Sequence, residues 1–256
     1  MRTMATFFVD PSTITPPVIR IAGYLLHHLR DSLRLHPGDS LTLNDGCGTR
    51  YRVEVTHVTS QAIESRIIDR QTAPAHTTFP VVLGQAMLKG DKMDWVLQKA
   101  TELGVAAIVP IDSAHSVVRP HPERLHHQRS RWERIVRDAA QQSERWSIPS
   151  LADPVDLAGV FRQYASAAIK GMLMERLNGP SLGTMSLPQD SQRPIVLLVG
   201  PEGGWALDEQ RFAQEQGFLP LTLGPRILRA ETAAVAALSI LQSRLDEIER
   251  DRGKKC

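Results

Sequence analysis

The first part of the chain alternates apolar and polar residues in the pattern of half-buried strands. Tyr51, Val53 and Val55 are separated by polar residues, so one face of their strand is expected to be buried. The pattern predicts strands over 6–9, 40–44, 50–57 and 62–68, with a helical segment over 22–35. Together these segments predict a small, mostly antiparallel β domain, followed by a Pro-, Thr- and Ala-containing linker over 69–80.

From residue 80 onward, short apolar runs alternate with amphipathic helical segments. Strands are predicted over 81–87, 106–111, 171–174, 195–199 and 218–223. Helices are predicted over 91–104, 156–164, 207–215 and from about Glu231 into the 240s. A further long helix is predicted to end near Ser143. Such alternation predicts an α/β fold, a parallel sheet with helices on both faces. We therefore divide the chain into domains at 1–72 and 73–256.

Composition indicates the general class of protein but does not indicate what the protein binds. The chain has 256 residues, of which 42% are hydrophobic and 23% charged, as expected of a globular protein. No apolar run approaches the ~18 residues that a membrane span needs, and the N-terminus lacks the pattern of a signal peptide. Only Cys47 and Cys256 are present, so we expect no disulfide framework, no metal site and a reducing cytoplasm.

An arginine-rich stretch lies between residues 119 and 145. It holds arginines at 119, 124, 129, 131, 134, 137 and 145, with acidic residues at 123, 133, 138 and 144. The arginines could contact phosphate. The alternative is a solvated helix face with ion pairs between residues four apart.

Two Gly-Pro corners each connect a predicted strand to a predicted helix. The first reads LVGPEGGW over 198–205 and the second LGPRILRAET over 223–232. Ligands of open α/β sheets bind outside the carboxyl ends of the strands, where both corners lie. Gly200, Gly203 and Gly204 lack a Cβ atom, so the backbone can approach a ligand closely. The sequence thus predicts a site built largely from backbone groups.

The corners do not match a known phosphate-binding pattern. They lack the Gly-Lys-Ser/Thr ending of the P-loop, and Glu202 would repel a phosphate. An adenosine ligand with little net negative charge fits better. The alternative is that the corners are tight turns that pack strand on helix, that Glu231 only complements the helix dipole, and that Thr232 caps the helix.

The paired corners resemble the signature of the RsmE-type 16S rRNA (uracil-N3) methyltransferases, S-adenosylmethionine (SAM) enzymes of the SPOUT class. The resemblance covers the chain, since HHLRDSLRLHPGD (27–39), LQKATELGV (97–105) and QQSERWSIPSL (141–151) are similar to further family motifs. The sequence departs from the family at Gln141, Glu144, Trp205 and Ala230, where Glu, Gly, Phe and Thr or Val are usual.

The resemblance implies a SPOUT trefoil-knot methyltransferase domain preceded by a small PUA-like β-barrel domain that helps to bind RNA. It also implies a homodimer, and 16S rRNA of the small ribosomal subunit as substrate. Carried over by motif, the residues that bind SAM are Leu198, Gly200, Glu202, Gly203, Leu223, Gly224, Ile227 and Leu228. The role of Glu202 is the least defined of these.

The resemblance also places the chemistry at the start of the last helix. Arg229 is expected to stabilise the charge that develops on the uracil, Glu231 to orient Arg229 or accept a proton, and Thr232 to hydrogen-bond the base. Alternatively, Arg229 binds only phosphate and Glu231 only pairs with it. In the first domain Arg20, Arg30 and Arg34 are the candidate RNA contacts, with the last two expected on one helix face.

Two other functions compete with methyl transfer. One is an inactive RNA-binding protein of ribosome assembly that keeps the fold, which the intact corner motifs argue against. The other is a nucleotide- or phosphate-binding enzyme, which the missing P-loop lysine and the absence of clustered carboxylates disfavour.

Overall fold

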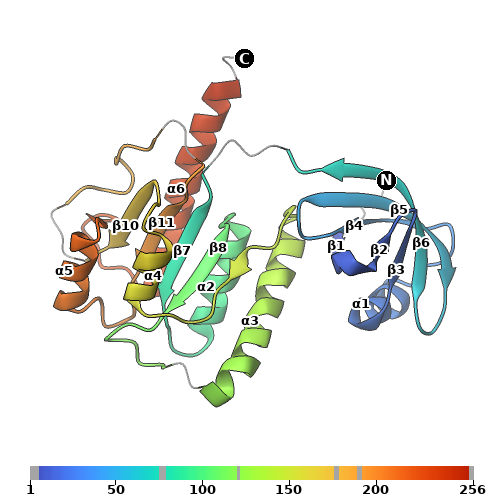
Figure 1. Cartoon of the computed structure of the whole chain (residues 1–256), viewed down its shortest axis with the longest axis horizontal. Coiled ribbons are helices and arrows are strands. Elements are labelled where there is room, and N and C mark those ends of the chain that lie inside the picture. The colour runs from blue at the N-terminus through green and yellow to red at the C-terminus, as the bar shows by residue number, and fades with distance from the viewer. Residues whose placement is uncertain (1–5, 75–78, 120–121, 176–178, 189–191, 254–256) are drawn as a thin grey trace. The chain divides into compact units, whose positions relative to one another are not determined.

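The computed structural model describes residues 6–74, 79–119, 122–175, 179–188 and 192–253 (Figure 1). The chain forms two compact units, the first made of residues 1–76 with 140–148 and the second of 77–139 with 149–256. The predicted domain division near residue 72 did not include the segment 140–148 in the first unit. Cys256 and part of the predicted linker, residues 75–78, lie outside the described residues, whereas Cys47 is an exposed free thiol.

The first unit is a six-stranded, mostly antiparallel sheet that curls around one apolar core. Its elements are β1 (Thr6–Phe8), η1 (Pro11–Thr13), β2 (Ile14–Thr15), β3 (Val18–Ile21), α1 (Gly23–His27), η2 (His28–Ser32), β4 (Ser40–Asn44), β5 (Thr49–Val58) and β6 (Ile63–Thr72). The strand order is β1-β4-β5-β6-β3-β2, with only β1 and β4 parallel. The predicted alternation in β5 is confirmed, since Tyr51, Val53 and Val55 are buried.

Two expectations for this unit are corrected, and one hairpin was missed. The first part of the predicted linker, residues 69–72, belongs to β6. The hairpin of β2 and β3 was not predicted, because Pro16 and Pro17 interrupt the apolar pattern between the two strands. Arg34 does not share a helix face with Arg30, because η2 ends at Ser32 and Arg34 adopts a left-handed backbone conformation with φ 52°.

The second unit is an α/β fold around a six-stranded parallel sheet of order β12-β10-β11-β7-β8-β9. Its strands are β7 (Val81–Ala86), β8 (Ala107–Ile111), β9 (Ser150–Leu151), β10 (Ile169–Leu173), β11 (Ile195–Val199) and β12 (Leu219–Leu221). Its helices are α2 (Asp91–Glu102), α3 (Pro122–Gln142), α4 (Leu157–Gln163), α5 (Leu207–Glu215) and α6 (Ala230–Gly253). The predicted α/β class is confirmed.

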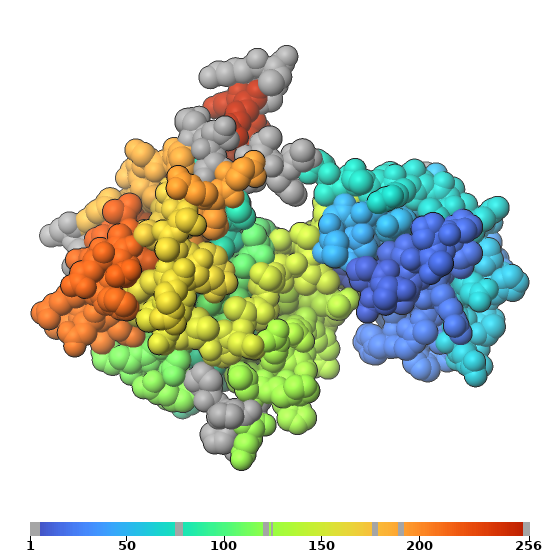
Figure 2. All heavy atoms as spheres, viewed as in Figure 1, coloured from blue at the N-terminus to red at the C-terminus, as the bar shows by residue number. Residues whose placement is uncertain are grey.

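Helices cover both faces of this sheet. On the near side in Figure 1, α4 and α5 pack side by side, and Figure 2 shows their yellow and orange atoms adjoining. Phe161 of α4 and Phe212 of α5 contact each other with ring centroids 5.0 Å apart. Phe161 joins a buried cluster with Val196 and Leu198 of the central strand. On the other side, α2 and α6 contact each other. Both faces of β11 are therefore buried, which explains its uninterrupted apolar sequence.

Within the described ranges, no helix is both long enough and apolar enough to span a bilayer.

Candidate active site

A cavity of about 750 Å³ opens at the carboxyl ends of three neighbouring strands, β11, β10 and β12. The residues that line it are 173–175 after β10, 199–201 and 203–205 after β11, Leu207 and Gln210 of α5, 222–228 after β12, and Ala230 and Ala233 of α6. Both Gly-Pro corners predicted to form a site thus line one cavity. Its volume is in the range of small-molecule sites, which is roughly 300–1,000 Å³.

Most residues predicted to bind SAM line this cavity. They are Gly200, Gly203, Leu223, Gly224, Ile227 and Leu228. Leu198 is not among the lining residues and is fully buried in the core, where its Cδ2 atom packs against Gly84. The side chain of Leu198 thus packs in the core, and its assignment to SAM binding stays a prediction.

Sequence reasoning missed the contribution of β10. Leu173, the last residue of this strand, lines the cavity together with Met174 and Glu175. The signal was available, because parallel strands bring their carboxyl ends to one edge of the sheet, and residues 171–174 had been predicted as a strand. Trp205, Leu207 and Gln210 were also not proposed as lining residues.

A different structural feature favours glycine at each of the three glycine positions of the first corner. A Cβ atom on Gly200 would lie 3.2 Å from Nε1 of Trp205, and one on Gly203 would lie 3.1 Å from Cβ of His115. Gly204 has open space around it but a φ of +69°, which disfavours any residue with a side chain. Gly200 and Gly203 therefore allow protein groups to approach closely, in addition to any approach of a ligand.

Trp205 anchors the first corner in the core. Its side chain is buried, and Nε1 donates a hydrogen bond to the carbonyl oxygen of Leu173 at 3.1 Å. Its own carbonyl oxygen accepts a hydrogen bond from Nε2 of Gln210 at 2.9 Å. The indole thus connects the corner after β11 to the end of β10 and forms part of the cavity wall.

Glu202 points to a lysine and does not line the cavity. Its Oε1 lies 2.8 Å from Nζ of Lys92 at the start of α2. Burial raises the pKa of Glu202, but the hydrogen bonds from Lys92 and from backbone N–H groups outweigh it, so the pKa is lowered overall. The hydrogen bond with Glu202 likewise raises the pKa of Lys92. The negative charge of Glu231 also raises this pKa, and the positive charge of Arg229 lowers it. The predicted cofactor residue Glu202 is a partner of Lys92.

The three candidate catalytic residues lie at the start of α6. Ala230 and Ala233 of this helix line the cavity, whereas Arg229, Glu231 and Thr232 do not. Arg229 and Thr232 are exposed, and both Arg229 and Glu231 are close enough to Lys92 to affect its pKa. Thr232 is the third residue of α6, so the alternative that it serves as the N-cap is wrong.

Glu231 carries an unused acceptor in a buried position. Its Oε2 atom is buried and has no hydrogen-bond partner among the described residues. A buried acceptor without a partner is uncommon, because it loses its hydrogen bonds to water without compensation. In the first turn of α6 the carboxylate also complements the positive end of the helix dipole.

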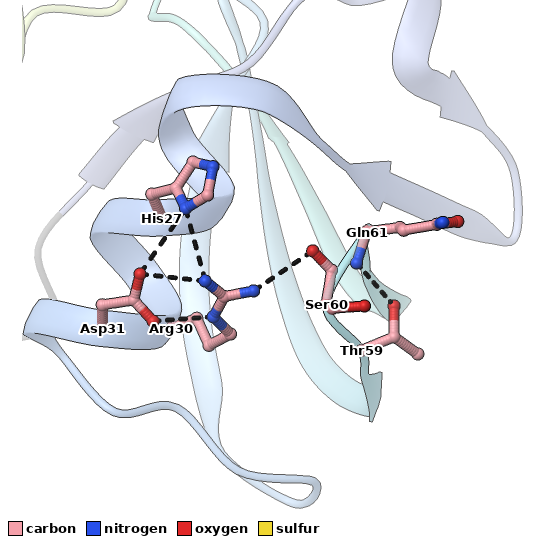
Figure 3. Close-up of polar contacts among 6 residues, drawn as sticks. All are labelled: His27, Arg30, Asp31, Thr59, Ser60 and Gln61. Atoms are coloured by element: carbon pink, nitrogen blue, oxygen red, sulfur yellow. Dashed lines mark hydrogen bonds and ion pairs between the residues drawn. The ribbon is translucent and has the colours of Figure 1, made fainter.

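The candidate RNA contacts of the first unit differ in their availability. Arg30 is held within the unit, since Nε and Nη2 donate to Asp31 at 2.7 and 3.0 Å and Nη1 donates to the carbonyl oxygen of Ser60 at 3.1 Å (Figure 3). The hydrogen bond with Arg30 lowers the pKa of Asp31. Arg20 and Arg34 are exposed, so they are the more available pair.

Three arginines of the arginine-rich stretch form ion pairs in the structure. Arg119 lies 2.9 Å from Asp112, Arg129 pairs with Glu133 and Asp153, and Arg131 pairs with Asp94. Arg145 is partly buried in the first unit, and burial lowers its pKa to about 10. Ion pairing therefore accounts for Arg119, Arg129 and Arg131, and the pair of Arg129 with Glu133 has the predicted spacing of four residues. Arg134 and Arg137 remain exposed on α3.

Across the described residues, no three His, Cys, Asp or Glu side chains converge in a way that could hold a metal ion.

Comparison with known proteins defines the class. Residues 75–242 match the family model described as RNA methyltransferase domain, and residues 25–68 match the model described as RNA methyltransferase PUA domain. The fold and the cavity are therefore those of an RNA methyltransferase with a PUA domain. The chain belongs to the ribosomal RNA small subunit methyltransferase E family, as the resemblance of its motifs predicted.

Curated relatives and solved structures agree on this family. The ribosomal RNA small subunit methyltransferase E of Synechocystis is 34% identical over 93% of this chain and 77% of its own length, and that of Bacillus subtilis is 29% identical over 92% and 94%. The structure of the Neisseria gonorrhoeae enzyme bound to SAM has a TM-score of 0.83 at 32% identity, covering 94% of this chain and 98% of that one. A putative methyltransferase from Legionella pneumophila in complex with SAM has a TM-score of 0.84 at 31% identity, with the same coverage.

Proposed function

We propose that this protein transfers the methyl group of SAM to N3 of a specific uridine in 16S rRNA. The observation that carries the proposal is the cavity formed by both Gly-Pro corners at the carboxyl ends of β10, β11 and β12. Two of the similar solved structures, both above 30% identity, contain SAM. The proposal includes the setting that the family resemblance implies: a knotted SPOUT domain, a PUA-like domain, a homodimer, the small ribosomal subunit and the cytoplasm. The predicted boundary between the two domains near residue 72 is kept, with segment 140–148 assigned to the first.

The lining of the cavity fits SAM. Glycines at 200, 203, 204 and 224 leave backbone groups accessible, and the only charged side chains among the lining residues that the structure describes are Glu175 and Arg226. A site of this kind suits a ligand with an apolar adenine and little net charge. We propose Gly200, Gly203, Leu223, Gly224, Ile227 and Leu228 as its contacts, and assign Glu202 to holding the corner through Lys92. When bound, SAM supplies a methyl group activated by the adjacent sulfonium.

The start of α6 offers a cation and N–H donors that can stabilise negative charge on the uracil. Loss of the N3 proton leaves negative charge on O2 and O4, and a fixed cation or N–H donor at those atoms stabilises it. Arg229 is exposed beside the cavity-lining Ala230, and the first-turn N–H groups of α6 have no acceptor within the helix. Both features support a role for this helix start in stabilising the uracil anion.

Glu231 and Thr232 complete the proposed site. The buried Oε2 of Glu231 without a partner supports its assignment as the acceptor of the N3 proton, with orientation of Arg229 as the alternative role. Thr232 is exposed in the same helical turn, where its hydroxyl can hydrogen-bond the base.

A methyl-transfer assay on unmodified small ribosomal subunits tests the proposal. We expect labelled SAM to yield label in 3-methyluridine after the rRNA is digested and its nucleosides are identified by mass spectrometry. Label in another nucleoside would contradict the N3 assignment and leave the methyltransferase activity. Binding of S-adenosylhomocysteine without any label would point to another RNA, and failure to bind it would favour an inactive assembly protein.

Within the first unit, we propose Arg20 and Arg34 as contacts to rRNA phosphates. The double variant Arg20→Glu/Arg34→Glu should weaken binding of 16S rRNA, because each lost phosphate contact removes counterion release and lowers the slope of log K against log salt by about 1. Filter binding at several salt concentrations measures both quantities. The matched control is Arg30→Ala, which removes the contacts to Asp31 and Ser60 and should lower thermal stability with less effect on the salt slope. An unchanged slope in the double variant would rule out these two contacts.

A further inference from the structure

His115 contacts the first Gly-Pro corner from a different part of the sheet. It lies in the segment after β8, and its Nδ1 atom is 3.2 Å from the carbonyl oxygen of Gly203 and 3.1 Å from that of Gly204. Carbonyl oxygens only accept hydrogen bonds, so Nδ1 must carry the hydrogen and donate. One imidazole nitrogen thus holds two successive carbonyl groups of the corner.

This contact sets the orientation of the corner's peptide groups. The N–H group of Gly204 already donates to the carbonyl oxygen of Pro201 at 3.0 Å. A trans peptide places its C=O and N–H groups on opposite edges. With the carbonyl of Gly204 directed at His115, the N–H group of Trp205 is directed away from it. Gly203, Gly204 and Trp205 all line the cavity, so the orientation of these peptides determines what the wall offers a ligand.

The segment that carries His115 is itself fixed. Arg119 pairs with Asp112 at 2.9 Å, and the hydroxyls of Ser113 and Ser116 lie 2.9 Å apart in a buried position. Such local bonds restrict the backbone on both sides of His115. The imidazole therefore projects from a segment that its own polar side chains hold in place.

A glutamate connects the same segment to the helix that follows the corner. Oε1 of Glu209 accepts a hydrogen bond from the backbone N–H of Ala114 at 2.8 Å, and Oε2 accepts one from Ala206 at 2.9 Å. Because Ala206 is the N-cap of α5, this carboxylate joins the helix start to the His115 segment. The corner is thus held at its glycines by His115 and at its end by Glu209.

Gly203 leaves room for the close approach of His115. A Cβ atom at this position would lie 3.1 Å from Cβ and 3.6 Å from the carbonyl oxygen of His115. The glycine therefore lets the histidine reach the two carbonyl groups.

We propose that His115 is a positioning residue for SAM: its Nδ1–H bonds to Gly203 and Gly204 hold the corner in the conformation that binds the cofactor. The inference rests on the proposed function and assigns a residue that the family motifs at 198–205 and 223–232 do not contain. His115 does not line the cavity, so it acts through the corner.

Three variants of His115 separate the donor from the bulk of the side chain. Asparagine places an amide N–H at the position of Nδ1, whereas glutamine places one farther out, at the position of Nε2. By isothermal titration with S-adenosylhomocysteine, we expect His115→Ala and His115→Gln to raise Kd about tenfold, the effect of a lost hydrogen bond, and His115→Asn to restore most of the affinity. The KM for SAM should rise in the same order with kcat within about twofold of the unsubstituted protein.

Controls exclude a general loss of structure. His115 is exposed, so Tm should change by less than about 2 °C in all three variants. An alanine variant that binds as tightly as the unsubstituted protein would overturn the proposal, and so would an asparagine variant as weak as alanine. If the unsubstituted protein itself bound no S-adenosylhomocysteine, the proposed function would fail first. Amide exchange of residues 200–205 would then still test the contact, since His115→Ala should accelerate it and unchanged exchange would refute the role of His115.

Discussion

Replacing Arg229 by alanine is expected to lower kcat for methyl transfer about a hundredfold to a thousandfold. Removing one donor that stabilises developing negative charge has an effect of this size in other enzymes. Because Arg229 is exposed and does not line the cavity, the Kd for S-adenosylhomocysteine should stay within about twofold. The measurement is single-turnover transfer of labelled methyl to unmodified small subunits, with saturating SAM.

Two further substitutions test whether the lower rate of Arg229→Ala results from the loss of the guanidinium group. Arg229→Lys keeps the charge but loses the planar pair of N–H donors, so its rate should lie between those of arginine and alanine. The matched control is Arg211→Ala, since Arg211 is an exposed arginine of α5 in the same unit. Equal rates for Arg229→Ala and the unsubstituted protein would remove Arg229 from the mechanism. A proportional loss of RNA binding, with an unchanged single-turnover rate at saturating RNA, would support the alternative that it only binds phosphate.

Replacing Trp205 by alanine is expected to reduce the free energy of unfolding by about 3–5 kcal/mol, the usual effect of deleting a buried large aromatic side chain. The indole is only 7% exposed and packs on Gly200, so its loss opens the wall of the cavity as well as the core. Binding of S-adenosylhomocysteine should be lost in the same variant. Urea unfolding followed by circular dichroism measures the stability, and titration calorimetry measures the binding.

The hydrogen bond and the ring can be separated. Trp205→Phe keeps an aromatic ring but leaves the carbonyl oxygen of Leu173 without its donor, so it should cost about 1–3 kcal/mol. Trp95→Phe is the control, since Trp95 is 41% exposed on α2 and its substitution should change the stability by less than about 0.5 kcal/mol. Equal destabilisation by Trp205→Phe and Trp95→Phe would contradict the anchoring role of Trp205.

The parts of the fold that follow local rules were predictable from the sequence. The apolar run of β11, the glycine-rich turn after it and the amphipathic α5 each follow from residues adjacent in the chain. The alternation of strands and helices was enough to predict a parallel sheet, and the rule about carboxyl ends placed the site on its edge. Strong local signals thus defined both the class of fold and the location of the cavity.

The detailed reasons for the motif residues were not predictable, because they depend on partners far away in the sequence. Gly203 packs closely against His115, and the carbonyl oxygen of Gly203 that this histidine contacts is 88 residues away in the chain. Glu202 is held by Lys92, which is 110 residues away. Arg34 was misplaced for a local reason, since no sequence signal marked the end of η2 before it. Side-chain orientation, as for Leu198, requires the tertiary structure.

Because segment 140–148 belongs to the first unit, this unit cannot complete its contacts early in synthesis. The buried side chain of Asn44 donates to the carbonyl oxygen of Arg145, 101 residues later, at 2.9 Å, and the guanidinium of Arg50 lies 3.9 Å from the ring centroid of Trp146. A nascent chain emerges N-terminus first at about 5–20 residues per second. The first unit therefore reaches its final set of contacts only after β7 and β8 of the second unit have been synthesised. A fragment that stopped at residue 72 would leave the amide of Asn44 without this acceptor.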